Sequence, residues 1–471
     1  MKVLLLNPPW DGIRAGSRWP FKTGKRKEYR RGEYLTYPFW LCYTSSLLKQ
    51  NGHEARVIDA IAEHLSHEEF LKIVMKEDPD LIVIETSTPS INVDYNYAKL
   101  FSKKFKVVLT GTHVSVLFEE ALHQVPEAII ARGEYEYTLL DLANSKDLNK
   151  IPGIVYLESG EIKINREREL IEDLDSLPFP DRDSVPIYRY WDGFCQHWPA
   201  VQMISSRGCL FRCIFCVWNA VMDKFKWRPR TPSNVVDEIE YCIRKYHFKE
   251  VYFDDSTFNM KPDHVYDICE ELIAKKIKIP WSAMCSSVTL SYDMLKRMKE
   301  AGCIGIKFGV ESADENVLRK IKKPLDLEKI QMIGKWCKKL RIKTHATFVI
   351  GLPGENEETI EKTLNFMKKL DVDSMQVSIA TPFPGTEFFE MATKENWLRV
   401  KSWEMFSGSD SCVISYPNLS REKIENGFRE ANKIILRKKV KNLRCLMSKL
   451  PVISRSPFHF LRILYKLWAT K

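Results

Sequence analysis

Residues 205–219 read SSRGCLFRCIFCVWN and contain three cysteines, Cys209, Cys213 and Cys216, in the spacing C-x3-C-x2-C. Three thiolates on one loop suit three irons of a cubane [4Fe–4S] cluster, with the fourth iron left open for another ligand. The apolar residues between the cysteines would shield such a cluster and tune its potential. Two alternatives stay open. A structural zinc site usually takes four ligands in C-x2-C pairs, and no second pair is present; buried, unrelated thiols are also common.

The loop follows a predicted strand, and residues 200–395 continue as about six strand–helix units. This alternation predicts a partial (β/α)6 barrel of the TIM type, in which the active site lies at the carboxyl ends of the strands. Each candidate motif of this region follows such a strand. The sequence therefore predicts that the cysteine loop and these motifs share one end of a barrel.

Strands and helices also alternate over residues 1–145, which predicts an α/β, Rossmann-like domain with a parallel sheet covered by helices on both faces. Ligands of such sheets bind at the carboxyl ends of the strands. Residues 146–199 include the proline- and acid-rich stretch LPFPDRDSVP (177–186) and are predicted to be a linker. Residues 396–471 are predicted to be a separate, helical C-terminal region that ends in a basic tail.

The C-x3-C-x2-C motif after the first strand of a β/α barrel resembles the radical S-adenosylmethionine (SAM) enzymes. The resemblance implies that Cys209, Cys213 and Cys216 bind a [4Fe–4S] cluster and that SAM chelates the open iron through its amino and carboxylate groups. In this family an electron from the cluster cleaves SAM to a 5′-deoxyadenosyl radical, which abstracts hydrogen. A ferredoxin or flavodoxin would supply the electron.

The same resemblance assigns SAM contacts to three other strand ends. The second strand would meet the amino group, the fourth the ribose hydroxyls, and the fifth the adenine. A carboxylate accepts hydroxyl hydrogen bonds well, and glycines allow close backbone approach. Helix capping and ordinary turns are the alternatives at each position. The candidates are Asp254 and Asp255, then Glu311 and Ser312, then Gly351, Pro353 and Gly354.

Lys307 and Arg230 are further candidates, as partners for the SAM carboxylate or an anionic substrate, although solvated surface charge is the favoured interpretation for both. Cys285, Cys303 and Cys412 are candidate hydrogen-atom donors, with inert buried thiols favoured.

A parallel-sheet domain ahead of this barrel resembles the subgroup that carries an N-terminal cobalamin (B12)-binding domain. The resemblance implies that Ser87 and Thr88 are hydroxyl partners of cobalamin and that Gly111 allows its close approach. The D-x-H-x-x-G motif that supplies an imidazole to cobalt is absent, as it generally is in the subgroup. His53 and His113 are expected to be surface or loop histidines. Thr110 replaces a usual glycine, and its side chain is expected to crowd the nucleotide.

The net charge of +10 comes from the tail, because residues 433–471 contain eleven Lys or Arg and no Asp or Glu, which leaves residues 1–432 at −1. Nucleic acid is therefore not the expected partner. In a helix, Phe458, Leu461, Tyr465 and Trp468 would share one face, which is typical of an interfacial helix on an anionic membrane. A helix packed on the barrel is the alternative. With no apolar run long enough to span a bilayer and no export signal, we expect a cytoplasmic protein with peripheral contact at the inner face of the membrane.

These features predict a radical SAM enzyme that uses cobalamin to methylate an unactivated carbon of a small-molecule or lipid-type substrate. Residues 12–20 and 378–398 are loosely similar to hopanoid-biosynthesis members of the subgroup. The alternative within enzymes is a radical rearrangement or C–C bond formation without methyl transfer. The alternative outside enzymes is an iron–sulfur or cobalamin carrier at the membrane, which would have no use for the SAM-contact strand ends.

Overall fold

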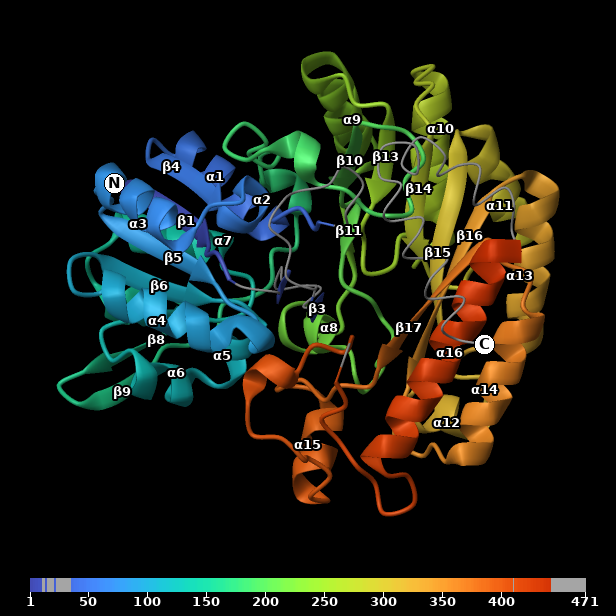
Figure 1. The fold of residues 1–471 in the computed structure, drawn as a ribbon. Helices are drawn as coiled ribbons and strands as arrows, with labels where there is room; N and C mark the ends of the chain where they lie inside the picture. Colours follow the sequence, from blue (N-terminus) through green and yellow to red (C-terminus); the bar gives the residue numbers. More distant parts are fainter. Residues whose placement is uncertain (11–12, 15–20, 23–34, 410, 442–471) are drawn as a thin grey trace.

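The computed structural model describes residues 1–10, 13–14, 21–22, 35–409 and 411–441. Within these residues the strands form a seven-stranded sheet, a six-stranded sheet and two short two-stranded ribbons. The two large sheets lie side by side, the first from the N-terminal third of the chain and the second from the middle (Figure 1). Two α/β units were predicted, and this arrangement confirms the predicted fold class.

The first sheet has the order β4-β1-β5-β6-β7-β8-β9, and its first five strands are parallel. Their side chains alternate between two cores. Leu5 and Val83 pack with helices α1 and α7, whereas Leu4 and Ile82 pack with α3 and α4 on the other face. The bounds are β1 (Lys2–Asn7), β4 (Glu54–Asp59), β5 (Leu81–Glu85), β6 (Lys106–Thr110) and β7 (Ile129–Ala131), with α1 (Phe39–Gln50), α3 (His67–Glu77), α4 (Ile91–Phe101) and α7 (Glu136–Asn144).

The start of α3 shows how local sequence determines an element. Ser66 caps the helix by accepting from the backbone N–H of Glu69, and the Glu69 carboxylate accepts from the backbone N–H of Ser66. This reciprocal pair satisfies two N–H groups that a helix start leaves unpaired. The S-x-x-E pattern of residues 66–69 is therefore a capping box.

The predicted linker 146–199 is wrong in its first part. Strands β8 (Ile154–Glu158) and β9 (Glu161–Ile164) form an antiparallel hairpin that extends the first sheet. Gly160, at φ +83°, forms the turn, and the apolar side chains at 154–156 are buried. The first domain therefore continues past residue 145, because these two strands supply the edge that covers β7.

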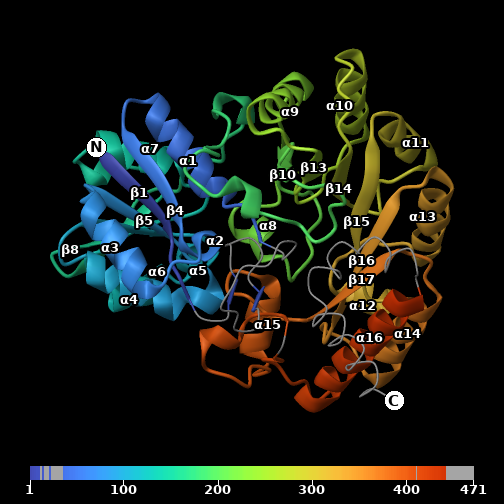
Figure 2. The same cartoon turned by 45° about the horizontal axis from the view of Figure 1, so that its top comes forward.

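The second sheet consists of six parallel strands in chain order, which confirms the predicted partial barrel. Its helices lie along the outside of the curved sheet (Figure 2). The strands are β10 (Ala200–Met203), β13 (Glu250–Phe253), β14 (Trp281–Cys285), β15 (Cys303–Glu311), β16 (Lys343–Ile350) and β17 (Ser374–Ile379). The helices are α9 (Pro232–Tyr246), α10 (Pro262–Ala274), α11 (Tyr292–Glu300), α12 (Glu315–Lys320), α13 (Leu327–Leu340) and α14 (Glu357–Lys369).

The expectation of a separate C-terminal region is also wrong. Helix α16 (Arg421–Lys441) packs on β17 and α14, with Ile424 against Gly351, and so completes the outer helical layer. Between β17 and α16, the chain passes through α15 (Glu387–Lys394) and the short helix η5 (Trp403–Met405), which contacts the first domain. The amphipathic tail around Phe458 lies outside the described residues. No helix in the described part of the chain is long and apolar enough to span a bilayer.

Candidate active site

The three cysteines lie on a loop that is closed at its base by a two-stranded ribbon. Strand β11 (Ser206–Arg207) enters the loop and β12 (Arg228–Pro229) leaves it, and the two pair antiparallel. We call residues 208–227 the cluster loop. It contains the short helix α8 (Val217–Val221). Because β11 follows directly from β10, the loop begins at the carboxyl end of the first barrel strand, as predicted.

A buried asparagine shapes the cluster loop. The side chain of Asn219 accepts from the backbone N–H of Cys209 at 3.1 Å and donates to the carbonyls of Cys209 and Phe211, both at 2.9 Å. These bonds cross the loop and hold its first turn independently of any bound group. Sequence reasoning missed Asn219, because an asparagine in a loop gives no indication that it is buried.

All three cysteines are free thiols, and each is partly buried. Burial raises the pKa of Cys213 to about 11 and that of Cys216 to about 12, so iron binding must displace protons. The hydroxyl of Thr257 lies 3.3 Å from the sulfur of Cys209. Among the described residues no three His, Cys, Asp or Glu side chains converge as ligands of a single ion. Each thiolate of a cubane binds a different iron, so the donor set fits a cluster better than zinc.

A carboxylate and an amine lie beside the cluster loop. Glu311 ends β15 with φ +65°, a left-handed conformation that is costly for a residue with a side chain and that is often found at functional sites. Its carboxylate lies 2.6 Å from the amine of Lys323. Burial lowers the pKa of Lys323, but Glu311 and the thiols of Cys213 and Cys209 raise it, with a net increase. Sequence reasoning missed Lys323, one of several lysines in a short polar stretch.

The two aspartates after β13 differ in their surroundings. The carboxylate of Asp255 is fully buried and accepts from the backbone N–H and hydroxyl of Ser205 and from the hydroxyl of Ser206, the last at 2.6 Å. It therefore holds the strand that leads into the cluster loop. Asp254 is buried at the same strand end, where its backbone N–H donates to Met203. The SAM contact predicted for each remains a prediction.

Ser312 lies next to Glu311 but packs away from it, because it is fully buried with its hydroxyl 3.3 Å from that of Thr363 on α14. The helix cap considered for this segment is provided by Asp314, whose carboxylate accepts from the backbone N–H groups of Asn316 and Val317. Ser312 thus supports the loop after β15.

The turn after β16 is held from both sides. Gly351 has φ +93°, its N–H donates to Glu355 at 2.6 Å, and its carbonyl accepts from the hydroxyl of Tyr416 at 2.7 Å. Gly354 also has a positive φ, against the aliphatic stem of Lys320, and Pro353 is buried. Packing alone accounts for these glycines, and the adenine contact remains a prediction.

The favoured interpretation of Lys307 and Arg230 as solvated charges is wrong. The Lys307 amine lies 2.6 Å from the buried carboxylate of Asp192, and the Arg230 guanidinium lies 2.6 Å from that of Glu238. Both cations are paired with buried carboxylates, because buried charges require partners. Both side chains already pair with a carboxylate of the protein, so we do not expect them to bind the SAM carboxylate. Lys323, in contrast, lies near the thiols of the cluster loop.

In the first domain, the predicted cobalamin contacts gather at the carboxyl ends of β5 and β6. The hydroxyl of Ser87 lies 3.0 Å from that of Ser90, and the hydroxyl of Thr88 lies 3.2 Å from Nδ1 of His113. A Cβ at Gly111 would lie 2.3 Å from the carbonyl oxygen of Thr86, so the neighbouring strand end requires glycine here. These polar groups are buried and are partnered by one another.

Two expectations for this edge are wrong. The Thr110 side chain does not project from the edge, since it is fully buried and its hydroxyl donates to the carbonyl of Ala131 at 2.9 Å. His113 is not at the surface. It is fully buried, 3.6 Å from Glu120 and edge-on to the ring of Trp403 at 5.1 Å, and burial lowers its pKa. His53 lies elsewhere, half-buried beside the N-terminus.

A buried ion network joins the first domain to the base of the cluster loop. Arg207 and Arg228, on the ribbon, lie 3.0 Å and 2.6 Å from the carboxylate of Glu134, which lies between β7 and α7 of the first domain. Arg207 also forms an ion pair with Glu136 at 2.7 Å, although its geometry is not that of a hydrogen bond. Arg228 lies 3.0 Å from the carboxylate of Asp223 in the cluster loop. Burial opposes ionisation of Glu134, but the two guanidinium groups hold its pKa below the ordinary value.

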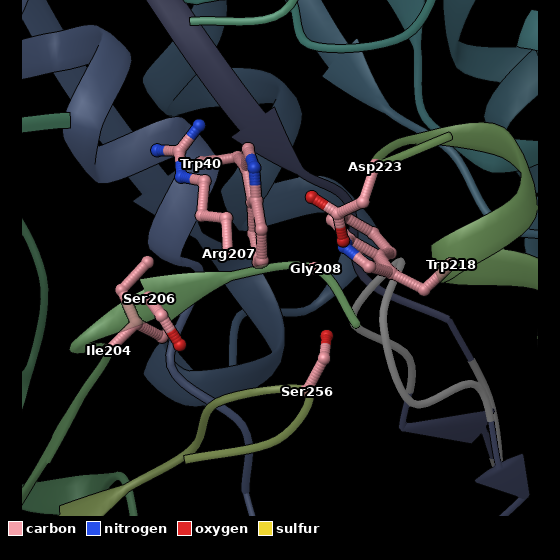
Figure 3. Close-up of a pocket in the computed structure, with 8 residues that line it drawn as sticks. All are labelled: Trp40, Ile204, Ser206, Arg207, Gly208, Trp218, Asp223 and Ser256. Atoms are coloured by element: carbon pink, nitrogen blue, oxygen red, sulfur yellow. The ribbon is translucent and has the colours of Figure 1, made fainter. Parts of the chain in front are cut away.

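Figure 3 shows this junction at the small pocket around Gly208. Trp40 of α1 and Trp218 of α8 lie above the chain at Gly208, and Ser256 from the loop after β13 lies below it (Figure 3). The centroids of the two indole rings are 4.2 Å apart, and the Arg207 guanidinium lies 5.5 Å from the centroid of the Trp40 ring. Three parts of the chain therefore meet at the first residue of the cluster loop.

Comparisons with known proteins agree with this arrangement. The family model of the radical SAM superfamily matches residues 203–367, and that of the B12 binding domain matches residues 30–143. A protein of Pyrococcus horikoshii, named only as an uncharacterized methyltransferase, is 32% identical over 441 residues, or 92% of this chain and 91% of that one. The protein belongs to the radical SAM superfamily. It is a radical SAM enzyme with a B12-binding domain, and its cofactors are a [4Fe–4S] cluster, SAM and cobalamin.

Two more distant matches are informative. The anaerobic magnesium-protoporphyrin IX monomethyl ester cyclase of Cereibacter sphaeroides is 27% identical over 412 residues, which are 83% of this chain and 63% of the cyclase. The structure of the radical SAM methyltransferase TsrM from Kitasatospora setae has a TM-score of 0.67 at 17% identity and covers 85% of this chain and 77% of its own. The second match shows that the two enzymes share a fold.

Proposed function

We propose that this radical SAM enzyme transfers a methyl group from SAM, by way of cobalamin, to an unactivated carbon of its substrate. One observation carries the proposal. The carboxyl edge of the B12-binding domain packs directly on the cluster loop, with α5 (Thr112–Val116) against α8. Gly385, in the loop after β17, lies between Val116 of α5 and Val221 of α8, and a Cβ there would lie 2.6 Å from both side chains.

This contact favours methyl transfer because it brings the ligand-binding edge of a methyl-carrying domain to the radical site. When bound, the cluster supplies an electron for SAM cleavage and cobalamin carries the methyl group, and the protein supplies binding and orientation. Cys209, Cys213 and Cys216 hold the cluster. In this proposal Lys323 binds the SAM carboxylate, and Glu311, with Asp254 at the neighbouring strand end, binds the ribose and amino groups.

In the first domain, the proposal assigns cobalamin contacts to Ser87, Thr88 and Gly111 at the edge that faces α8. His113 holds Thr88 and is itself covered by Trp403 from the C-terminal region, so it serves as a positioning residue. Asp255 positions the entry to the cluster loop through Ser205 and Ser206.

A second candidate reaction is radical C–C bond formation without methyl transfer, and the identity with the cyclase of Cereibacter sphaeroides favours it. The lipid-type substrate considered above rests on the basic tail, which lies outside the described residues.

Labelled SAM separates the two reactions. The enzyme, reconstituted anaerobically with iron, sulfide and cobalamin, is incubated with reductant, extract of its source cells and SAM with a trideuterated methyl group. Methyl transfer predicts a product three mass units heavier than the product from ordinary SAM, together with S-adenosylhomocysteine and 5′-deoxyadenosine. A new product that forms with 5′-deoxyadenosine but carries no deuterium from the methyl group would instead support the second candidate.

A further inference from the structure

The inner face of the barrel is polar along its last three strands. In β16 the helix-facing residues Ala346, Phe348 and Ile350 are fully buried, whereas the alternate residues His345 and Thr347 face inward and are partly exposed. Strand β17 repeats the pattern, because Met375, Val377 and Ile379 join the outer core. On β16 the same alternation also turns Lys343 and the apolar Val349 inward. We call the polar inward residues between them, with Lys307 of β15 and those of β17, the inner polar face: Lys307, His345, Thr347, Ser374, Gln376 and Ser378.

The strand register places these side chains in neighbouring rows. His345 pairs with Lys307 on one side and with Ser374 on the other, and Thr347 pairs with Gln376. Directly paired residues on one face of a sheet are close enough to contact the same ligand. The face is therefore continuous across three strands, and β15 carries it towards Glu311 at the end where the cluster loop lies.

The face is polar but carries no unpaired charge in the described residues. The ammonium group of Lys307 is paired with Asp192 at 2.6 Å and lies over the ring of Tyr252. His345 is kept neutral, because burial and the charges of Lys307 and Lys439 lower its pKa to about 3. Its Nδ1 lies 2.8 Å from the hydroxyl of Ser374. The Phe194 ring packs on both residues, 5.7 Å from the Lys307 amine and 6.0 Å from the His345 ring, so the accessible part of the face consists of hydroxyl and amide groups.

The opposite end of the barrel is filled by the protein itself. The ring of Phe194 occupies the space that Gly305 leaves, since a Cβ there would lie 2.6 Å from the ring. Cys195 and Tyr252 pack in the same cluster, partly covered by Trp191. A ligand on the inner polar face is thus bounded at the amino ends of the strands and approaches the cluster from below.

We infer that the inner polar face binds the reacting part of the substrate, and that this part is a polar, uncharged group rich in hydroxyls or amides rather than an acyl chain. An acyl chain would cover the accessible polar groups of Thr347, Gln376 and Ser378 without offering them hydrogen bonds, which is unfavourable for each group. Hydroxyls and amides would satisfy them. The inference rests on the proposed methyl transfer and identifies the substrate class for that reaction.

The first test follows a radiolabel. The reconstituted full-length enzyme is incubated with reductant, extract of its source cells and SAM labelled with ¹⁴C in the methyl group, and the products are partitioned between chloroform and water. We expect labelled product in the aqueous phase. Label in the chloroform phase would overturn the inference and leave methyl transfer intact. Formation of 5′-deoxyadenosine with no labelled product in either phase would contradict the proposed methyl transfer, and the inference with it.

The second test asks whether this face is the site. Thr347→Val and Gln376→Leu remove hydrogen-bonding groups and keep side-chain size, and Thr393→Val on the exposed side of α15 is the matched control. With the aqueous fraction as substrate, we expect each face variant to raise KM roughly 3- to 10-fold, the loss of one neutral hydrogen bond. Iron content and 5′-deoxyadenosine formed without substrate should match those of the parent. A KM equal to that of the control in both face variants would overturn the assignment.

Discussion

The ion network below the cluster loop and the inner polar face of the barrel use polar residues in opposite ways. Arg207, Arg228, Glu134 and Glu136 are charged, buried and paired with one another across two domains. The residues of the inner polar face carry no unpaired charge and are partly exposed, and Gln376 is the most exposed of them. Charges that are paired with one another inside the protein fix geometry, whereas polar groups left accessible are available to a ligand. The comparison leads to four predictions.

The largest effect is expected from breaking the network. Arg207→Met leaves Glu134 and Glu136 buried with one guanidinium fewer, and the loss of one partner of a buried ion pair costs about 3–5 kcal/mol. The free energy of unfolding, measured with urea, should fall by that amount. Lys226→Met is the control, since the Lys226–Glu172 pair also joins the cluster loop to a distant segment of the chain but is mostly exposed, and it should cost less than about 1 kcal/mol. Equal losses in both variants would mean that the network contributes no more than a surface pair.

Glu250 is a buried carboxylate without a cation as partner, so replacing it should raise the free energy of unfolding instead of lowering it. Glu250, in β13, accepts from the backbone N–H groups of Gln196 and His197, and burial raises its pKa to about 7. Because the folded pKa lies above the unfolded value of about 4.3, this group weakens stability progressively as pH rises from about 4 to 7. Glu250→Gln should change stability little at pH 4.5 and raise it by roughly 3 kcal/mol at pH 8. Urea unfolding at the two pH values tests this, and an equal effect at both would contradict it.

Lys323 shares one feature with each of the two regions. Its amine is charged and paired with Glu311, as in the ion network, but it lies beside the thiols of the cluster loop, where a ligand is expected. Lys323→Met should weaken SAM binding roughly 10- to 100-fold, the range for a lost charge-assisted hydrogen bond, and keep the iron content of the parent. Lys323→Arg should recover most of the affinity. The neighbouring exposed Lys322→Met is the control. Calorimetric titration of anaerobic protein with SAM gives the affinities, and unchanged affinity in Lys323→Met would remove Lys323 from the SAM site.

The smallest effect is expected at Thr110, a residue at the cobalamin edge whose polar group already has a partner in the protein. Its hydroxyl is turned into the sheet towards Ala131, so Thr110→Gly should leave the Kd for cobalamin within about threefold and cost roughly 1 kcal/mol of stability. Absorption titration with cobalamin measures the first and urea unfolding the second. A large gain in affinity would show that the threonine crowds the nucleotide after all.

The sequence predicted what depends on local pattern. Strand–helix alternation identified both sheets, and the spacing of Cys209, Cys213 and Cys216 located the cluster loop. It did not predict burial of polar residues. Lys307 and Arg230 were interpreted as solvated because their partners, Asp192 and Glu238, are not neighbours that local sequence identifies.

Long-range packing accounts for the other differences. The sequence did not predict the hairpin β8–β9, because its place in the first sheet depends on pairing with β7, which lies more than twenty residues earlier in the chain. The position of α16 depends on contacts with β17 and α14, and the burial of His113 depends on Trp403, almost 300 residues away. Such contacts leave no trace in a single sequence.

The most direct test of the central claim, a cluster held by three cysteines and open at its fourth iron, is iron analysis of anaerobically reconstituted protein. The parent should bind about four irons per chain with the brown absorption of a [4Fe–4S] cluster. The variant with Cys209, Cys213 and Cys216 all replaced by alanine should bind almost none, and Cys285→Ala, which removes a buried thiol outside the loop, should match the parent. Parental iron content in the triple variant would contradict the claim.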